Sequence, residues 1–242
     1  MTELRVLPVR GLPEVVAGAD VAALIAGALE LEDSDVVVVA QKIVSKAEGR
    51  IVRLEEIEPG EHARELAGDD DPRKLEVILR EAKRLVRVRA PLIVAETQHG
   101  FICGSAGVDA SNAPEEGTLV LLPVDPDASA ERMRTRFLEL AGAHVAVIVS
   151  DSFGRPWRIG TTDVAIGAAG LAVLRDLRGT RDRRGYELRS TQIAVADELA
   201  GAAELVMGKA DGVPAAVIRG VDVRGAGRAR DLVIPEERDL FR

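Results

Sequence analysis

The chain is poor in cysteine and in long apolar runs, and each shortage excludes a class of protein. Cys103 is the single cysteine among 242 residues, which excludes an internal disulfide framework and a cysteine zinc site. The apolar runs are far too short for a membrane-spanning helix, and the N-terminus begins like a strand instead of a signal peptide. These features fit a cytoplasmic protein without a membrane partner.

Lysine is also scarce, and the chain as a whole is acidic. The formal net charge is −8, so binding of nucleic acid through the overall electrostatic field is not expected. An anionic ligand would therefore have to meet local cations. Lysine occurs only at positions 42, 46, 74, 83 and 209, which draws attention to each of these residues.

Aromatic residues make up only 2% of the chain. Four of the six fall in segments rich in glycine or arginine instead of the predicted strands and helices: Phe101, Phe153, Trp157 and Tyr186. Two interpretations are open. The rings could form a site for a planar ligand, or they could anchor loops.

The pattern of apolar residues predicts an α+β (mixed α/β) fold. Strands are expected at 4–9, 36–40, 91–95, 118–122, 145–149 and 215–218, and helices over 126–141 and 191–207. Residues 11–15 are expected to lead into an alanine-rich helix that has Glu14 and Asp20 early in it and ends near Leu31. A further helix begins at Asp71-Pro72 and carries Leu75, Ile78, Leu79 and Leu85 on one face. Strands and helices alternate only in part, which argues against a doubly wound sheet. We expect one domain over 1–242, or two closely joined subdomains.

The segment 96–112 is the most informative, because it combines small residues with carboxylates directly after a predicted strand. Small residues let a backbone approach a bound anion closely. Glu96 and Asp109 supply the hard oxygen ligands that Mg²⁺ or Mn²⁺ prefers. The segment therefore indicates a site for a nucleotide phosphate and a metal, with a long polar loop as the alternative. His99 is the only histidine in such a segment.

A second such segment follows the predicted strand 145–149. Asp151 and Ser152 stand at its end, where metal ligands are common in α/β proteins. A carboxylate at the end of a buried strand is costly unless it is paired or bound to a metal. The following residues, 153–158, are expected to form a rigid loop that brackets an anionic or planar substrate.

Two further segments that could bind a ligand are basic. Lys42 and Lys46 follow the apolar strand 36–40 and would share one face of a helix, where they could hold a phosphate. Residues 175–189 contain six arginines, interleaved with three carboxylates and Tyr186. This second segment is either a mobile basic flap over a phosphorylated substrate or a solvated loop with paired charges. Both common glycine-rich nucleotide fingerprints are absent from the chain.

Together these segments resemble the coenzyme F420:L-glutamate ligase family (F420-0:gamma-glutamyl ligase). The matching segments are 11–14, 40–46, 96–103, 106–112, 150–158, 206–214 and 217–220. They extend over nearly the whole chain in the family's order. Some bacterial relatives carry a fused nitroreductase-like domain, and this chain resembles the freestanding form.

The resemblance implies an enzyme that uses GTP and a divalent metal, Mg²⁺ or Mn²⁺, with K⁺ as a further cofactor. It would attach L-glutamate to the lactyl carboxylate of F420-0 through an acyl phosphate and then add gamma-linked glutamates. The family fold is an intertwined α+β homodimer. Two other functions stay open: a nucleotide-dependent ligase acting on another carboxylate, and a catalytically silent nucleotide-binding regulatory protein.

The resemblance also implies roles for individual residues. Asp109 and Asp151 match the catalytic, metal-binding aspartates, and Ser152 lies beside the second. Lys209 falls in a metal-contacting stretch, but a protonated lysine cannot ligate a metal, so that role is not carried over. The positions that match nucleotide contacts are Leu12, Pro13, Glu14, Val15, Gln41, Lys46, Asn112, Met207, Gly208 and Asp211. The motifs do not define the substrate contacts; our own predictions for these are Arg155, Trp157, Arg158, Arg175, Arg178 and Tyr186.

Overall fold

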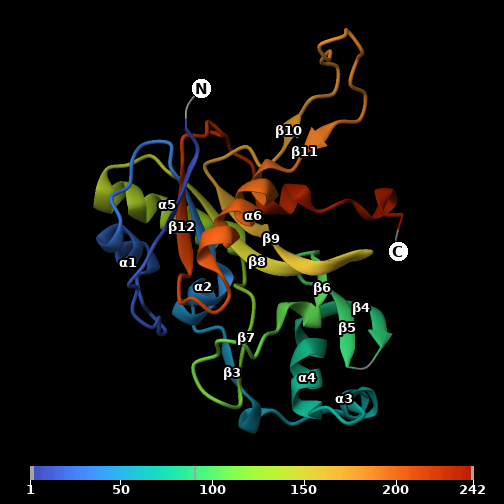
Figure 1. Ribbon diagram of the computed structural model, residues 1–242. Coiled ribbons are helices and arrows are strands. Elements are labelled where there is room, and N and C mark those ends of the chain that lie inside the picture. Colours follow the sequence, from blue (N-terminus) through green and yellow to red (C-terminus); the bar gives the residue numbers. More distant parts are fainter. Residues whose placement is uncertain (1–2, 90, 241–242) are drawn as a thin grey trace.

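A five-stranded sheet forms the centre of the computed structural model, which describes residues 3–89 and 91–240 (Figure 1). Its strand order is β1 (Arg5–Pro8), β12 (Ala215–Arg219), β2 (Val36–Ala40), β8 (Ala146–Arg155) and β9 (Arg158–Ala169). Only β2 and β8 run parallel; the other neighbours are antiparallel. The prediction that the uniformly apolar strand 36–40 lies in the middle of a sheet is confirmed.

Helices cover both faces of this sheet, because the side chains of each strand alternate between the faces. Val37 and Val39 pack on the side of α1 (Val21–Ala28) and α5 (Pro126–Ala141). Val36 and Val38 pack on the other side, against α6 (Val195–Met207). Strands and helices thus form a mixed arrangement of the expected α+β class.

A smaller core lies beside the sheet, in the lower right of Figure 1. It is built from the helices α3 (Glu61–Ala67) and α4 (Pro72–Glu81) and from a three-stranded sheet. The strands of that sheet are β4 (Ala82–Arg89), β5 (Leu92–Thr97) and β6 (Ile102–Gly104), and a two-stranded sheet of β3 (Ile51–Arg53) and β7 (Thr118–Val120) links this part to the rest. Four 3₁₀ turns are also described: Leu54–Glu56, Ser105–Gly107, Ala229–Leu232 and Glu236–Arg238.

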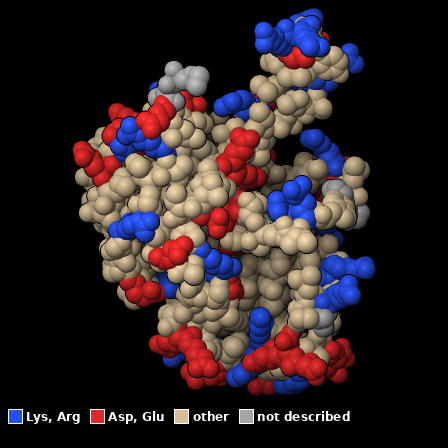
Figure 2. Space-filling model, viewed as in Figure 1, with Lys and Arg blue, Asp and Glu red and all other residues tan. Residues whose placement is uncertain are grey.

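The helix α2 (Gln41–Ala47) follows β2 directly and confirms that Lys42 and Lys46 lie on a helix. A two-stranded ribbon of β10 (Arg175–Asp176) and β11 (Gln192–Ile193) projects from the body (Figure 1). We call residues 175–193 the arm. Figure 2 shows a basic tip on the arm and a mainly acidic surface at the opposite end of the molecule, over α3.

Two helix predictions extended too far. The alanine-rich helix expected to have Glu14 early in it and to end near Leu31 is confined to Val21–Ala28, where the Asp20 side chain caps its N-terminus. Gly11 and Gly18 have positive φ angles of 75° and 83°, and such angles are incompatible with a continuous helix. The helix expected from 191 begins at Val195, since residues 192–193 pair with β10 instead.

Several strands were missed, and two of them lie in segments that were predicted to have another structure. Leu85 was expected on the helix that begins after Asp71, but that helix ends at Glu81 and Leu85 belongs to β4. The segment 153–158 was expected to be a rigid loop, yet β8 continues to Arg155 and turns directly into β9. Both errors have the same cause, because the partner strands that stabilise β4 and β9 are tertiary contacts. Among the described residues, no helix is long and apolar enough to cross a membrane.

Candidate active site

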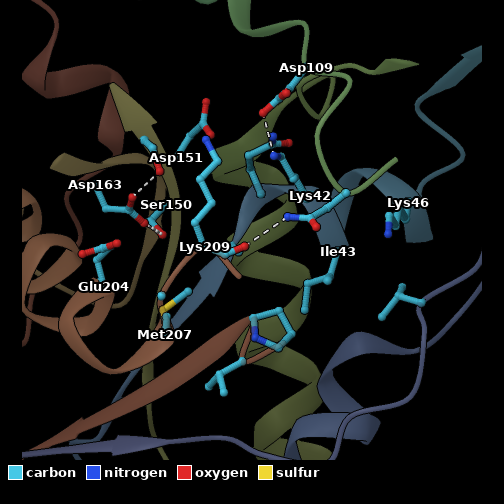
Figure 3. A pocket seen from close by; sticks show the side chains of 18 of the residues that line it. Lys42, Ile43, Lys46, Asp109, Ser150, Asp151, Asp163, Glu204, Met207 and Lys209 are labelled. Carbon is cyan, nitrogen blue, oxygen red and sulfur yellow. Dashed lines mark hydrogen bonds and ion pairs between the residues drawn. The ribbon is translucent and has the colours of Figure 1, made fainter. Parts of the chain in front are cut away.

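A pocket of about 560 Å³ opens at the edge of the central sheet where β2 ends and its parallel pairing with β8 stops, at Ala40 and Ser150 (Figure 3). Carboxyl ends of neighbouring parallel strands are a usual place for a ligand site. Segments far apart in the sequence line the pocket: 12–15, 40–43, 46, 104–105, 107–109, 112, 150–152, 163, 204, 207–210 and 212–214. The sheet therefore brings together segments that the sequence analysis had treated one by one.

Asp109 enters the pocket from the loop after β6 and is held by two neighbours. Lys42 Nζ donates to Asp109 Oδ2 at 2.6 Å, and Ser111 Oγ donates to the same oxygen at 2.8 Å. Burial alone would raise the pKa of Asp109. The hydrogen bond and charge of Lys42 and the hydrogen bonds from Ser111 have a larger, opposite effect and keep this pKa below its ordinary value. Asp109 is therefore an anion at neutral pH, and Lys42 is its counter-ion.

Asp151 lies on β8 in a less favourable environment. Burial raises the pKa of its carboxyl to about 7, and the negative charges of Asp163 and Asp109 add to the increase. The Ser152 backbone amide and the charge of Lys42 oppose it without cancelling it. The β8–β9 register shifts between Val149 and Ser150, and irregularities of this kind often re-aim side chains beside active sites. A cation placed next to Asp151 would relieve this unfavourable arrangement.

Asp163, on β9, was missed by the sequence analysis. It accepts hydrogen bonds from Ser150 Oγ at 2.9 Å and from Ser152 Oγ at 2.7 Å, and it is almost fully buried. The signal in the sequence that could have identified Asp163 was its position directly before the apolar run 164–169. Because no strand was predicted there, the residue could not be placed opposite Ser152.

The oxygen donors of this pocket have the right chemistry for a hard divalent cation. The carboxylates of Asp109 and Asp151 and the hydroxyl of Ser152 are ligands that Mg²⁺ accepts. Within the part of the chain that is described, no group of three or more His, Cys, Asp or Glu side chains is arranged as a ready-made metal site. Protein sites for Mg²⁺ often supply one or two carboxylates and leave the other positions to substrate phosphates and water, so the residues present fit the predicted ion.

The opposite wall of the pocket contains the residues predicted to contact a nucleotide. Lys46 is buried and forms an ion pair with Glu14 of the loop 12–15. Gln41 is 2% exposed; its Oε1 accepts from Ser45 Oγ, while its Nε2 has no hydrogen-bond partner among the described residues. A buried amide donor without a partner is costly and suits an oxygen atom of a ligand.

The loop that follows α6 forms a third wall of the pocket. Asn112 Nδ2 donates to the backbone carbonyl of Lys209 at 3.3 Å, which joins this loop to the segment after β6. Met207, Gly208 and Lys209 line the pocket, and Figure 3 shows the Lys209 side chain inside it. Asp211 is not among the lining residues and lies behind Gly208, where a Cβ would meet its Oδ2 at 2.1 Å.

The residues predicted to contact the substrate lie outside the lining of this pocket. Arg155 bonds to the backbone carbonyl of Ile159 at 2.6 Å, and Trp157 is 83% exposed at the turn between β8 and β9, next to Arg158. The other three belong to the arm: Arg175, Arg178 and Tyr186. Their role in substrate binding stays a prediction.

Three residues of the segment 96–103 serve the fold. Glu96 is buried, and its two carboxylate oxygens lie 2.8 Å from Lys83 Nζ and 2.6 Å from Arg84 Nε. Both oxygens have protein partners and Glu96 does not line the pocket, so the expectation that it is a metal ligand is wrong. His99 Nε2 lies 2.9 Å from the backbone oxygen of Pro123, outside the pocket. Burial and the charge of Asp151 raise the pKa of the Cys103 thiol to about 12, which makes it a poor nucleophile.

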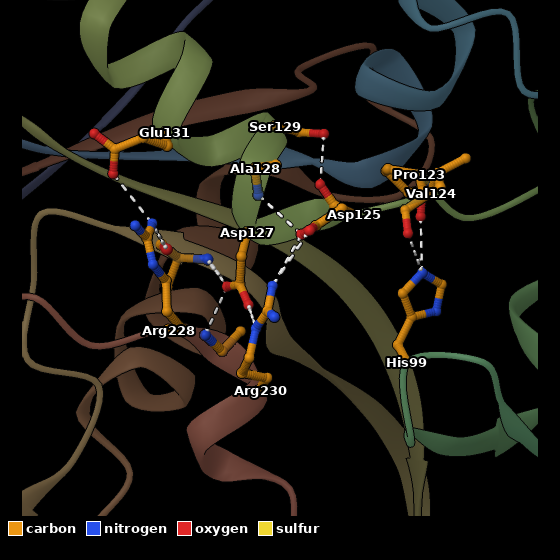
Figure 4. A network of polar contacts seen from close by, with 12 residues as sticks. His99, Pro123, Val124, Asp125, Asp127, Ala128, Ser129, Glu131, Arg228 and Arg230 are labelled. Carbon is orange, nitrogen blue, oxygen red and sulfur yellow. Dashed lines mark hydrogen bonds and ion pairs between the residues drawn. The ribbon is translucent and has the colours of Figure 1, made fainter.

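A second buried aspartate, Asp127, belongs to a different network (Figure 4). Its Oδ1 accepts from the backbone amides of Ala168 at 2.9 Å and Ala229 at 2.7 Å. Its Oδ2 accepts from Arg230 Nε at 2.8 Å. Asp127 thus ties α5 to β9 and to the segment near the C-terminus, with a donor for each carboxylate oxygen.

The protein has an α+β fold whose pocket is lined by three aspartates and three lysines, a combination of charged groups typical of enzyme sites. Residues 11–220 match the model of the F420-0:gamma-glutamyl ligase family. The chain is 49% identical to the coenzyme F420:L-glutamate ligase of Methanopyrus kandleri, over 99% of this chain and 98% of that protein. It is 47% identical to the protein of the same name from Methanothermobacter thermautotrophicus, over 99% of both chains. The chain belongs to the F420-0:gamma-glutamyl ligase family.

Proposed function

We propose that this chain is the ligase that joins L-glutamate to coenzyme F420-0, with GTP as co-substrate and Mg²⁺ or Mn²⁺ as the metal. Relatives named coenzyme F420:L-glutamate ligase match it over almost their full length. The observation that carries the proposal is the pocket: nine of the ten positions predicted to contact a nucleotide line it, together with Asp109, Asp151 and Ser152. These positions come from five separate segments of the chain, so their meeting in one pocket does not follow from proximity in sequence.

The chemistry explains why a nucleotide is needed. A carboxylate does not react with an amine at neutral pH, because its oxygen is a poor leaving group. In the proposed first step, an oxygen of the F420-0 lactyl carboxylate attacks the γ-phosphorus of GTP, GDP leaves, and an acyl phosphate forms. In the second step, the glutamate amine attacks the acyl carbon, phosphate leaves, and the amine proton passes to solvent. Further glutamates would be added by the same two steps on the γ-carboxylate.

The residues of the pocket would mainly bind and orient the reactants. Asp109, Asp151 and Ser152 would hold the divalent metal, which supplies positive charge to the transferring phosphoryl group when bound. Lys46 would bind a phosphate as a point charge, and Gln41 would donate to a nucleotide oxygen. Asp163 would keep the hydroxyls of Ser150 and Ser152 in place, because it accepts from both. Positioning of this kind is the main catalytic contribution of proteins to phosphoryl transfer.

Two finer features of the proposal come from the family resemblance, an intertwined homodimer and a supporting K⁺ ion, while a place in the cytoplasm comes from the single cysteine and the short apolar runs. The exposed apolar side chains of Trp157 and Ile159, at the end of the β8–β9 hairpin, are consistent with a contact between copies. Light scattering of the purified protein would give its oligomeric state.

The test is a direct assay. Purified protein is mixed with F420-0, L-glutamate, GTP and Mn²⁺ or Mg²⁺, and the products are measured by mass spectrometry. A gain of one or more glutamyl units that requires both GTP and metal would support the proposal, and ATP in parallel would test the nucleotide preference. GTP consumption only with other carboxylates would indicate a ligase for a different substrate. Nucleotide binding without turnover would indicate a silent regulatory protein.

A further inference from the structure

Most of the charged side chains of the pocket are matched with a partner. The described lining contains eight of them: Glu14, Lys42, Lys46, Asp109, Asp151, Asp163, Glu204 and Lys209. Lys42 pairs with Asp109, and Lys46 pairs with Glu14. Asp163 accepts from two serines, and Asp151 is proposed to bind the metal. Within the described residues, the side chains of Glu204 and Lys209 have no hydrogen bond or ion pair. One anion and one cation are therefore available to a ligand.

Glu204 lies on the last turn of α6, beside Asp163 of β9. Gly201, three residues earlier on the same face of the helix, packs closely against β9. A Cβ at Gly201 would lie 3.4 Å from Thr162 Oγ1 and 3.9 Å from the backbone oxygen of Asp163. Figure 3 shows the Glu204 side chain next to that of Asp163. Two neighbouring carboxylates make this corner of the pocket electronegative, which favours a ligand with an ammonium group.

Lys209 enters the pocket from the segment that follows α6. Gly208 ends the helix with φ 58° and ψ 155°, a conformation that favours glycine and turns the chain away from the helix. Asn112 holds the backbone carbonyl of Lys209, and the Lys209 side chain extends into the pocket (Figure 3). The Gly208 amide donates to the Glu204 carbonyl at 3.0 Å, which ties the two stretches together. A cation and an anion thus reach the pocket from the same end of α6.

We propose that Glu204 and Lys209 bind the amino-acid substrate, Glu204 through its ammonium group and Lys209 through its α-carboxylate. An α-amino acid carries these two opposite charges on one carbon atom, so it needs an anion and a cation that are not already neutralised. An amine held beside Asp163 lies next to the proposed metal site, where the acyl phosphate forms under the proposed function. This inference rests on the proposed function and adds to it the place at which the amino acid binds.

The test measures binding without turnover. L-Glutamate is titrated in a calorimeter into protein that contains Mg²⁺ and a GTP analogue with a non-hydrolysable link between the β- and γ-phosphates. Glu204→Gln and Lys209→Met should each weaken glutamate binding about tenfold or more, the loss of one charge-assisted hydrogen bond. The affinity for the GTP analogue should stay unchanged. Unchanged glutamate binding in either variant would overturn the proposal, whatever happens to the GTP analogue.

Two analogues of glutamate assign each charge to its residue. 4-Aminobutanoate lacks the α-carboxylate, and glutarate lacks the ammonium group. Wild-type protein should bind glutamate about tenfold more tightly than either analogue. Lys209→Met should remove only the difference between glutamate and 4-aminobutanoate, and Glu204→Gln only the difference between glutamate and glutarate. Differences that persist in the variants would overturn the assignment, even where overall binding is weaker.

Matched controls separate these two residues from a general effect of charge. Glu198→Gln changes the first turn of α6 and Lys74→Met changes α4, and both positions lie outside the pocket lining. Both control variants should bind glutamate like wild type. An equal loss of binding in the controls would overturn a specific role of Glu204 and Lys209.

Assays of ligation then distinguish this site from the proposed function. If glutamate binds through Glu204 and Lys209 but wild-type protein adds none to F420-0, the proposed function is wrong and the amino-acid site stands. If wild-type protein adds glutamate and neither variant raises the KM for glutamate, the proposed function stands and the amino-acid site is overturned.

Discussion

Asp127 and Asp151 are two carboxylates in the interior of the same protein, but their surroundings are opposite. Asp127 receives two backbone amides and the Arg230 guanidinium, which match both of its oxygens with donors (Figure 4). Asp151 stands beside two other aspartates, and its pKa rises to about 7 (Figure 3). The first arrangement stabilises the fold. The second is unfavourable in the protein alone, and a cation bound beside it would make it favourable.

This difference shows how a buried acid can be assigned to folding or to function. A buried carboxylate costs several kcal/mol unless hydrogen bonds and charges compensate it. Where the compensation comes entirely from the protein, the residue holds segments together. Where it is incomplete and the group faces a pocket, a ligand is expected to supply the rest. Mutations should therefore affect stability at one aspartate and activity at the other.

The largest effect is expected at the pocket. Asp151→Asn should lower glutamate ligation by about 10² to 10³-fold, because a preorganised electrostatic contact to the reacting centre is lost. Asp109→Asn should act in the same direction. Removal of an uncompensated acid should leave the melting temperature of the Asp151 variant unchanged or higher. Turnover at saturating metal checks the prediction, and near-wild-type turnover of either variant would show that its metal assignment is wrong.

The next largest effect is expected on the stability of the fold. Asp127→Ala leaves the amides of Ala168 and Ala229 and the Arg230 side chain without their acceptor. The free energy of unfolding should fall by about 3 kcal/mol, as for other broken buried charge networks. Urea denaturation measures it, with Asp69→Ala at an exposed position as the control. If Asp127→Ala lowered ligation without lowering the free energy of unfolding, the assignment of Asp127 to stability and of Asp151 to activity would be wrong.

A smaller effect is expected on nucleotide binding. Lys46→Met removes a buried cation but leaves the acids of the pocket in place, and it should weaken GTP binding about tenfold, the equivalent of one charge-assisted hydrogen bond. Titration calorimetry with GTP measures the affinity. Lys74→Met, on α4 and away from the pocket, is the matched control. Unchanged affinity in the Lys46 variant would remove this residue from the nucleotide site.

The smallest effect concerns Asp125, a neighbour of Asp127 that caps α5. Its side chain accepts from the Ala128 amide at 3.0 Å, and this bond, aided by Arg230, keeps the pKa of Asp125 below its ordinary value. Asp125→Ala should lower the free energy of unfolding by about 1 kcal/mol at pH 7.

The pH dependence of this contribution has a definite sign. Because the pKa is lower in the folded state, the unfolded chain binds the proton more readily. The contribution of Asp125 is therefore complete above the ordinary aspartate pKa and disappears as the pH falls through the lowered value. Unfolding measured from pH 6 down to pH 2 should show wild type and Asp125→Ala converging in acid, and a constant difference would contradict the assignment.

Local signals in the sequence predicted several elements correctly. The helix 126–141 was placed at its observed limits, because Pro126 suits the first turn and Gly142 can adopt the left-handed conformation at the end. The strand 36–40 was predicted from its valines alone. The arginine-bearing strand β4 and the strand β9 were missed, because their pairing partners, not their composition, make them strands.

The sequence by itself singled out the candidate residues of the site: Asp109, Asp151, Lys42 and Lys46. Only the tertiary structure decided how they meet. Lys42 pairs with Asp109 across 67 positions of sequence, and Asp163 reaches two serines because β9 folds back on β8. Short-range patterns in the sequence predict individual helices and strands. Contacts between residues far apart in the sequence depend on the order of strands in the sheet, which no local pattern determines.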